Sequence, residues 1–207
     1  MSQIKAVLFD LDGVLVDARE WHYEALNEAL AVFGFSISRE EHDSYYNGLP
    51  TVHKLRRLSL EKGFPVELHE LIQSLKQKHT KRRLHSLTRP SFEKQLMLRQ
   101  LKTGGIKLAV CSNSIRETVE VMLENAMLKH YFDLLLSNED VKNNKPDPEI
   151  YLLAMEKLGV KPEETIIVED APHGVMAAKA SGATVLVVDN ANDVNMYLFK
   201  NHLSHIY

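Results

Sequence analysis

Two aspartates separated by a single residue, Asp10 and Asp12, follow the apolar run Ala6–Phe9 and precede Gly13. Such a run predicts a buried strand, and the carboxyl ends of strands in α/β sheets open onto the ligand crevice. Residues i and i+2 of an extended chain point to the same side, so both carboxylates would face one reacting centre. Two close carboxylates repel each other unless a cation neutralises them. A hard, oxygen-seeking ion such as Mg²⁺ suits that role.

Three further polar clusters also follow predicted strands. Ser112-Asn113-Ser114 opens a predicted helix, whose first N–H groups favour an anion such as phosphate. Lys145 stands just before the rigid helix start Asp147-Pro148, and Glu169-Asp170 adds two more acids. All four clusters therefore fall at one edge of the predicted sheet, and this shared register indicates one reaction centre.

The chain alternates predicted strands with predicted helices. Apolar runs rich in Val, Ile and Leu predict buried parallel strands at Ala6–Phe9, Ile106–Cys111, Phe132–Leu136, Thr165–Val168 and Thr184–Val188. Helical patterns lie between the later runs, at Ser91–Thr103, Ser114–Met127, Pro148–Leu158 and Pro172–Ser181. This order predicts an α/β fold with a doubly wound parallel sheet.

Local sequence supports several helix boundaries. Ser114 to Glu117 fits a capping box, and Asp147 is a predicted N-cap with Pro148 at the first helical position. Gly159 and Gly182 follow helices at positions that favour a left-handed residue.

Residues 16–85 break the alternation, because they contain helical patterns and no convincing strand. They predict an inserted helical subdomain, which leaves 1–15 and 86–207 as the core. The first predicted helix, Arg19–Phe33, has an apolar face that includes Trp21 and Leu26. An insertion beside the Asp10/Asp12 loop would place a lid over the crevice.

Composition limits the classes of partner. The chain has 207 residues, 44% of them hydrophobic, and a net charge of −3 that selects neither nucleic acid nor a membrane surface. The single cysteine, Cys111, lies in an apolar run and predicts a buried core residue. No signal peptide or membrane-spanning segment is evident, so we expect a cytoplasmic protein.

The four clusters together resemble the four motifs of the haloacid dehalogenase superfamily, over about Ile4 to Val188. That resemblance implies a Rossmann-like core, a helical cap inserted after the first motif, and a magnesium-dependent aspartyl-phosphate mechanism. It further implies that Asp10 attacks phosphorus, while Asp12 protonates the leaving oxygen and then activates water. Dehalogenases of the superfamily lack an acid at the position of Asp12, so its presence favours phosphoryl chemistry.

The same resemblance assigns the binding residues. Ser112, Asn113 and Lys145 would bind the phosphoryl group. Mg²⁺ would be held by Asp10, Asp170 and the backbone carbonyl of Asp12, with Glu169 as a further ligand or as the residue that orients a metal-bound water.

Four residues of the predicted cap are candidates for contact with the substrate. His22 matches a histidine that reaches the catalytic acid in the β-phosphoglucomutases of this superfamily. Asn47, Gly48 and Thr51 fall on the mutase cap loop, where those enzymes have lysine, glycine and arginine. The glycine is kept, but the two bases are replaced, which removes positive charge that a bisphosphorylated intermediate needs.

These observations favour a phosphatase that acts on a small phosphorylated metabolite, such as a sugar phosphate. The alternatives are a hexose-phosphate mutase, a phosphonate-cleaving hydrolase with Lys54 as its Schiff-base lysine, and a non-catalytic binding or regulatory protein. A basic run, Lys76 to Arg83, is interpreted as a solvated helix face in preference to a substrate-steering patch. The sequence assigns no oligomeric state.

Overall fold

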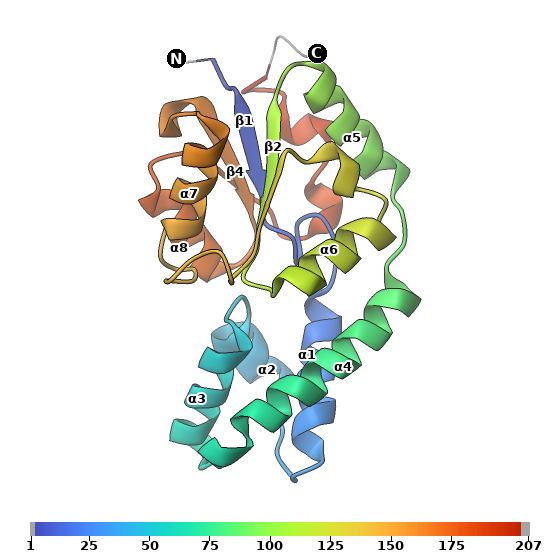
Figure 1. The fold of residues 1–207 in the computed structure, drawn as a ribbon, viewed down its shortest axis with the longest axis vertical. Helices are drawn as coiled ribbons and strands as arrows, with labels where there is room; N and C mark the ends of the chain where they lie inside the picture. Colours follow the sequence, from blue (N-terminus) through green and yellow to red (C-terminus); the bar gives the residue numbers. More distant parts are fainter. Residues whose placement is uncertain (1–2, 204–207) are drawn as a thin grey trace. The chain divides into compact units, whose positions relative to one another are not determined.

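A computed structural model describes residues 3–203 of the chain. It divides into two compact units, which we call the core unit (1–17 and 89–207) and the helical unit (18–88) (Figure 1). Within the described residues, no helix is both long enough and apolar enough to cross a membrane.

The core unit is built on a five-stranded parallel sheet, which confirms the predicted fold class. Its strands run in the order β3-β2-β1-β4-β5. Their bounds are Ala6–Phe9 (β1), Lys107–Cys111 (β2), Leu134–Leu136 (β3), Thr165–Glu169 (β4) and Thr184–Val187 (β5). The chain winds outward from β1 to β3 and then returns to β4 on the other side of β1. The change of direction at β1 is the place where doubly wound sheets bind their ligands.

Helices cover both faces of this sheet. Figure 1 shows α7 and α8 on one side and α5 and α6 on the other. These helices are Phe92–Thr103 (α5), Arg116–Asn125 (α6), Glu149–Leu158 (α7) and Pro172–Ala180 (α8), with short 3₁₀ turns at Lys129–Tyr131, Pro162–Glu164, Ala191–Asp193 and Met196–Phe199.

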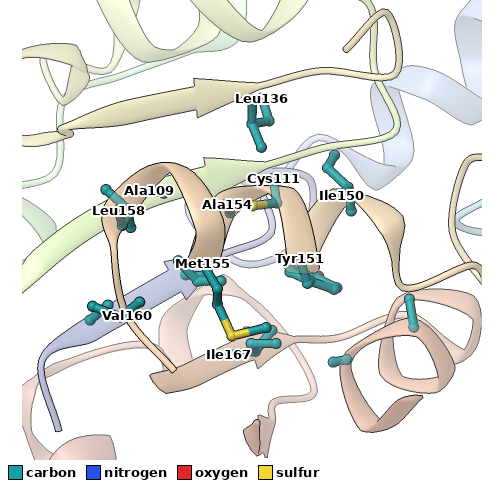
Figure 2. Close-up of a cluster of buried hydrophobic side chains, with 14 residues drawn as sticks. Ala109, Cys111, Leu136, Ile150, Tyr151, Ala154, Met155, Leu158, Val160 and Ile167 are labelled. Carbon is teal, nitrogen blue, oxygen red and sulfur yellow. The ribbon is translucent and has the colours of Figure 1, made fainter. Parts of the chain in front are cut away.

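A cluster of buried apolar side chains lies between α7 and the sheet. Ile150, Ala154 and Met155 of α7 belong to this cluster with Ala109 of β2 and Ile167 of β4 (Figure 2), and all five are buried. Burying apolar surface contributes roughly 25 cal/mol per Å², so this cluster fixes α7 firmly on the sheet.

Two predicted helix starts differ from the structure. The capping box at Ser114 is wrong, because α6 begins at Arg116 with Ile115 as its N-cap and no side-chain cap. The helix α7 begins at Glu149, so Pro148 is the N-cap residue and not the first helical one, although Asp147 Oδ1 accepts the Glu149 N–H at 2.9 Å.

Other local predictions are confirmed. Gly159 ends α7 in the left-handed conformation, with φ of 65°. Cys111 is completely buried, and burial raises the pKa of its thiol to about 12, which makes the thiol unreactive at neutral pH.

The helical unit contains α1 (Arg19–Ala31), α2 (Arg39–Glu41), a π-helical turn (His42–Tyr46), α3 (Thr51–Lys62), a 3₁₀ turn (Val66–Leu68) and α4 (His69–Leu87). Leu26 and Leu30 of α1 pack with Leu55 and Leu58 of α3 in its apolar centre.

The basic run on α4 divides into two kinds of residue. Lys78 and Arg82 are exposed, as expected of a solvated face. That interpretation is wrong for Arg83, whose side chain is only 14% exposed and donates to Glu24 at 3.0 Å and Glu28 at 2.6 Å on α1. Arg83 therefore joins the two longest helices of this unit.

His42 is a buried histidine at the start of the π-helical turn. It is 2% exposed, its Nδ1 lies 3.2 Å from Asp43 Oδ1, and its ring meets the Tyr23 ring edge-on at 5.0 Å. Burial, reinforced by the positive charge of Lys54, lowers its pKa from 6.5 to about 4. Folding therefore holds this imidazole neutral.

We expect the free energy of unfolding to fall as pH decreases from 6.5 to 4. In this range the unfolded chain binds a proton at His42, whereas the folded chain keeps the imidazole neutral. The loss attributable to this group approaches about 3 kcal/mol. Denaturant unfolding of the His42→Gln variant should show a shallower pH dependence in this window, whereas substitution of the exposed His53 by Gln should not. Equal slopes for His42→Gln and the wild type would contradict the assignment.

Candidate active site

Strand register brings the acidic clusters to one edge of the sheet. Phe9 of β1 is level with Val110 of β2 and Val168 of β4, so the next residue, Asp10, lies beside Glu169. The Asp10 N–H donates to the Val168 carbonyl at 3.0 Å, which continues the pairing one residue past β1. The neighbouring strands thus fix the backbone that carries Asp10.

Lys145 forms the charged centre of this edge. Its Nζ donates to Asp10 Oδ1 and to Glu169 Oε1, each at 2.6 Å, and its side chain is 3% exposed. Burial alone would lower the pKa of this ammonium, but the charges of Asp10 and Glu169 outweigh burial and raise the pKa above its usual value. The lysine is therefore a permanent cation between two carboxylates.

The surroundings of Asp10 have an excess of negative charge. Burial raises its pKa well above the usual value, Lys145 opposes the increase, and Glu169, Asp170 and Asp12 add to it. One ammonium does not balance this group of acids. A further cation would relieve the repulsion.

Three carboxylates of this group fit a metal ion. One oxygen each from Asp10, Glu169 and Asp170 lies within 4.8 Å of the others. An all-oxygen, anionic donor set is the kind that Mg²⁺ prefers. In the described part of the chain this group does not include the Asp12 carboxylate, whose Oδ2 instead accepts the Ser114 hydroxyl at 3.0 Å.

Both oxygens of Glu169 are occupied by donors. Oε1 accepts Lys145 and the Tyr151 hydroxyl, each at 2.6 Å, while Oε2 accepts the N–H groups of Asp170 at 3.0 Å and Ala171 at 3.3 Å. The Tyr151 ring also lies under the ammonium, with Nζ 4.8 Å from the ring centroid. Sequence reasoning missed Tyr151, because a tyrosine on an apolar helix face resembles any other core aromatic residue.

Gly174 is the second residue that sequence reasoning missed. It lies in the first turn of α8, and a Cβ placed there would come within 1.8 Å of Glu169 Oε1. Only a glycine lets the helix approach the carboxylate this closely.

The predicted phosphate-binding residues surround the same edge. Ser112 is 1% exposed, and its Oγ accepts the Ser114 N–H at 3.0 Å. Asn113 binds the backbone of Lys145 twice, since its Oδ1 accepts the Lys145 N–H at 3.2 Å and its Nδ2 donates to the Lys145 carbonyl at 3.4 Å. Asn113 therefore ties the loop that carries the lysine to the end of β2.

The predicted substrate residues of the cap all lie in the helical unit. His22 Nδ1 is 3.2 Å from Lys76 Nζ, Gly48 has a positive φ of 75°, and Thr51 begins α3. A hollow of about 340 Å³ in this unit is lined by Arg19, Glu20, Arg39, Asp43 and Asn47.

Arg39 of this hollow is paired with Glu20 and stacks over the Tyr23 ring at 4.1 Å. The two arginines and two carboxylates of the lining offset each other in charge.

Comparisons with known proteins agree with this arrangement. A family model described as haloacid dehalogenase-like hydrolase matches residues 7–188. The phosphorylated carbohydrates phosphatase of Thermotoga maritima is 30% identical over 200 residues, which cover 92% of this chain and 88% of that protein.

Two solved structures are also similar. CbbY from Rhodobacter sphaeroides, in complex with xylulose-(1,5)bisphosphate, is 29% identical, with a TM-score of 0.80 over 89% of this chain and 86% of its own. A β-phosphoglucomutase from Clostridium difficile has a TM-score of 0.83 over 98% of both chains. At 24% identity, it shows a shared fold and no more.

The Tyr151→Phe variant tests the anchoring of Glu169. Removing the hydroxyl leaves a buried carboxylate with one donor fewer, so we expect a loss of about 1–3 kcal/mol in the free energy of unfolding. Denaturant titration measures it. The matched control, Tyr197→Phe, alters an exposed ring and should change stability by less than about 0.5 kcal/mol. A Tyr151→Phe variant as stable as the control would contradict the anchoring role.

The Gly174→Ala variant tests the close approach of α8. A helical glycine replaced by alanine ordinarily gains about 1 kcal/mol, but the contact with Glu169 should reverse the sign and cost about 1–3 kcal/mol. Thermal and denaturant unfolding would show the direction. A more stable alanine variant would mean that Glu169 is not held where the structure has it.

Proposed function

Because the chain belongs to the haloacid dehalogenase-like hydrolase family, we propose that it is a Mg²⁺-dependent phosphatase of small sugar phosphates. The observation that carries the proposal is the buried Lys145, which is paired with Asp10 at the end of β1. A carboxylate held in this way, beside a cation and two further acids, is positioned as a nucleophile toward an incoming phosphoryl group.

The proposed reaction has two steps. An Asp10 carboxylate oxygen attacks phosphorus, the bond to the leaving oxygen breaks, and Asp12 gives its proton to that oxygen to release the sugar hydroxyl. Asp12 then takes a proton from water, whose oxygen attacks the phosphorus bound to Asp10. The bond between phosphorus and the Asp10 oxygen breaks, inorganic phosphate leaves, and both carboxyl groups return to their starting states.

The remaining core residues stabilise the charge that moves during these steps. Lys145 and the Ser112 hydroxyl would bind phosphoryl oxygens, assisted by N–H groups at the start of α6. Asp10, Asp170 and the backbone carbonyl of Asp12 would hold the metal ion. When bound, that ion supplies positive charge that offsets both the carboxylates and the phosphoryl group.

Glu169 has a different role in this proposal. Four donors already occupy its two oxygens, so we assign it the task of orienting Lys145 instead of a place among the direct metal ligands. A carboxylate held by its neighbours in this way fixes the direction of the ammonium that it pairs with.

A sugar phosphate is the substrate class that the relatives support. One similar protein is a phosphorylated carbohydrates phosphatase, and another was crystallised with xylulose-(1,5)bisphosphate. In the proposed enzyme the helical unit is the cap, and its residues His22, Asn47, Gly48 and Thr51 are the ones we expect to select the leaving group. The balanced charge around Asn47 gives no net attraction for a second phosphate, which favours hydrolysis over a mutase reaction.

The Asp10→Asn variant tests the nucleophile. With Mg²⁺ present, the wild type should release phosphate from members of a sugar-phosphate panel, and the variant should be slower by at least about a thousandfold. Chelation of the metal should abolish wild-type release, and added Mg²⁺ should restore it. Colorimetric detection of inorganic phosphate provides the measurement.

The control is Glu163→Gln, which removes an exposed acid from the turn before β4, at the opposite edge of the sheet. It should retain wild-type activity. Full phosphate release by Asp10→Asn would overturn the nucleophile assignment, and a wild type that hydrolyses no phosphate ester would overturn the function.

A further inference from the structure

Ser114 contacts the residue that would act as acid and base. Its Oγ donates to Asp12 Oδ2 at 3.0 Å, across a separation of 102 residues in the sequence. We propose that Ser114 is a positioning residue, which orients the Asp12 carboxyl group toward the leaving oxygen. This inference rests on the proposed function and adds to it a residue to which the family resemblance gives no role.

The backbone of Ser114 is held on both sides. Its N–H donates to Ser112 Oγ at 3.0 Å, and its carbonyl accepts the Asn138 N–H at 3.1 Å. These bonds hold the backbone from which the Ser114 hydroxyl reaches Asp12. Ser114 therefore links the proposed phosphoryl-binding hydroxyl of Ser112 to the proposed acid.

The hydroxyl of Ser114 is not used to cap α6. The helix begins at Arg116, its N-cap is Ile115, and no side chain caps its first turn. A serine followed three residues later by a glutamate ordinarily forms a capping box, worth about 1 kcal/mol. In this chain the contact with Asp12 takes the place of that local interaction.

The hydrogen bond from Ser114 reaches Asp12 from outside the loop that carries it. Asp12 lies on a tight turn, in which the Gly13 N–H donates to the Val16 carbonyl at 2.7 Å. With the Ser114 hydroxyl bound at Oδ2, we assign the transferred proton to Oδ1. Because Oδ2 accepts a hydrogen bond whether or not Oδ1 is protonated, the contact persists through both steps.

Two substrates with different leaving groups test this role. Nitrophenolate departs from p-nitrophenyl phosphate without a proton, whereas the alkoxide of β-glycerophosphate needs one. In the Ser114→Ala variant, kcat/KM for β-glycerophosphate should fall by about tenfold or more, since a misplaced acid costs up to about 100-fold. The value for p-nitrophenyl phosphate should stay within about twofold of the wild type, and Ser114→Thr, which keeps the hydroxyl, should behave like the wild type.

The Asp12→Asn background shows whether Ser114 acts through Asp12. Adding Ser114→Ala to Asp12→Asn should produce no further loss with β-glycerophosphate, because coupled residues are non-additive. An equal loss with both substrates, a loss confined to KM, or an additive double variant would overturn the positioning role. Hydrolysis of neither ester by the wild type would instead overturn the proposed function and this inference with it.

Discussion

The site in the core unit depends on the ion pairs that the buried Lys145 ammonium makes with Asp10 and Glu169. The ammonium neutralises part of the charge of Asp10, which directly follows β1, and of Glu169, the last residue of the adjacent β4, and these two acids would otherwise repel each other. Loss of one partner from a buried ion pair costs about 3–5 kcal/mol, because it leaves an uncompensated charge. The lysine therefore makes it possible for two acids to be buried at the point where the sheet changes its winding direction.

Three separate elements, β2, α7 and α8, contribute to keeping Lys145 in place. Asn113 at the end of β2 binds its backbone, and Tyr151 of α7 lies beneath its ammonium. Gly174 allows α8 to close against Glu169, the second acceptor of the lysine. Packing of α7 on the sheet and the approach of α8 to β4 thus serve one electrostatic arrangement. Fold stability and site geometry are consequently difficult to change separately in this region.

The sequence predicted those features that depend on strand position. Apolar runs locate the strands, and parallel strands necessarily bring the residues after them to one edge, so the amino-acid order alone is enough to group Asp10, Ser112 and Glu169. Local patterns cannot reveal contacts made by tertiary packing. Tyr151 resembles a core residue until its hydroxyl is seen to reach β4, and Gly174 resembles a weak helix position until its distance to Glu169 is measured.

Competition between local and distant partners explains two of the wrong predictions. Ser114 fits a capping box, yet its hydroxyl contacts Asp12, and Arg83 fits a solvated face, yet it is paired with acids on α1. In both cases a charged partner gives a stronger hydrogen bond than the neutral or solvent partner that the local pattern implies. A polar side chain that does not make the local interaction its sequence pattern predicts therefore indicates a tertiary contact worth testing. In this chain one such contact joins α1 to α4, and the other reaches the aspartate that the reaction would use as its acid.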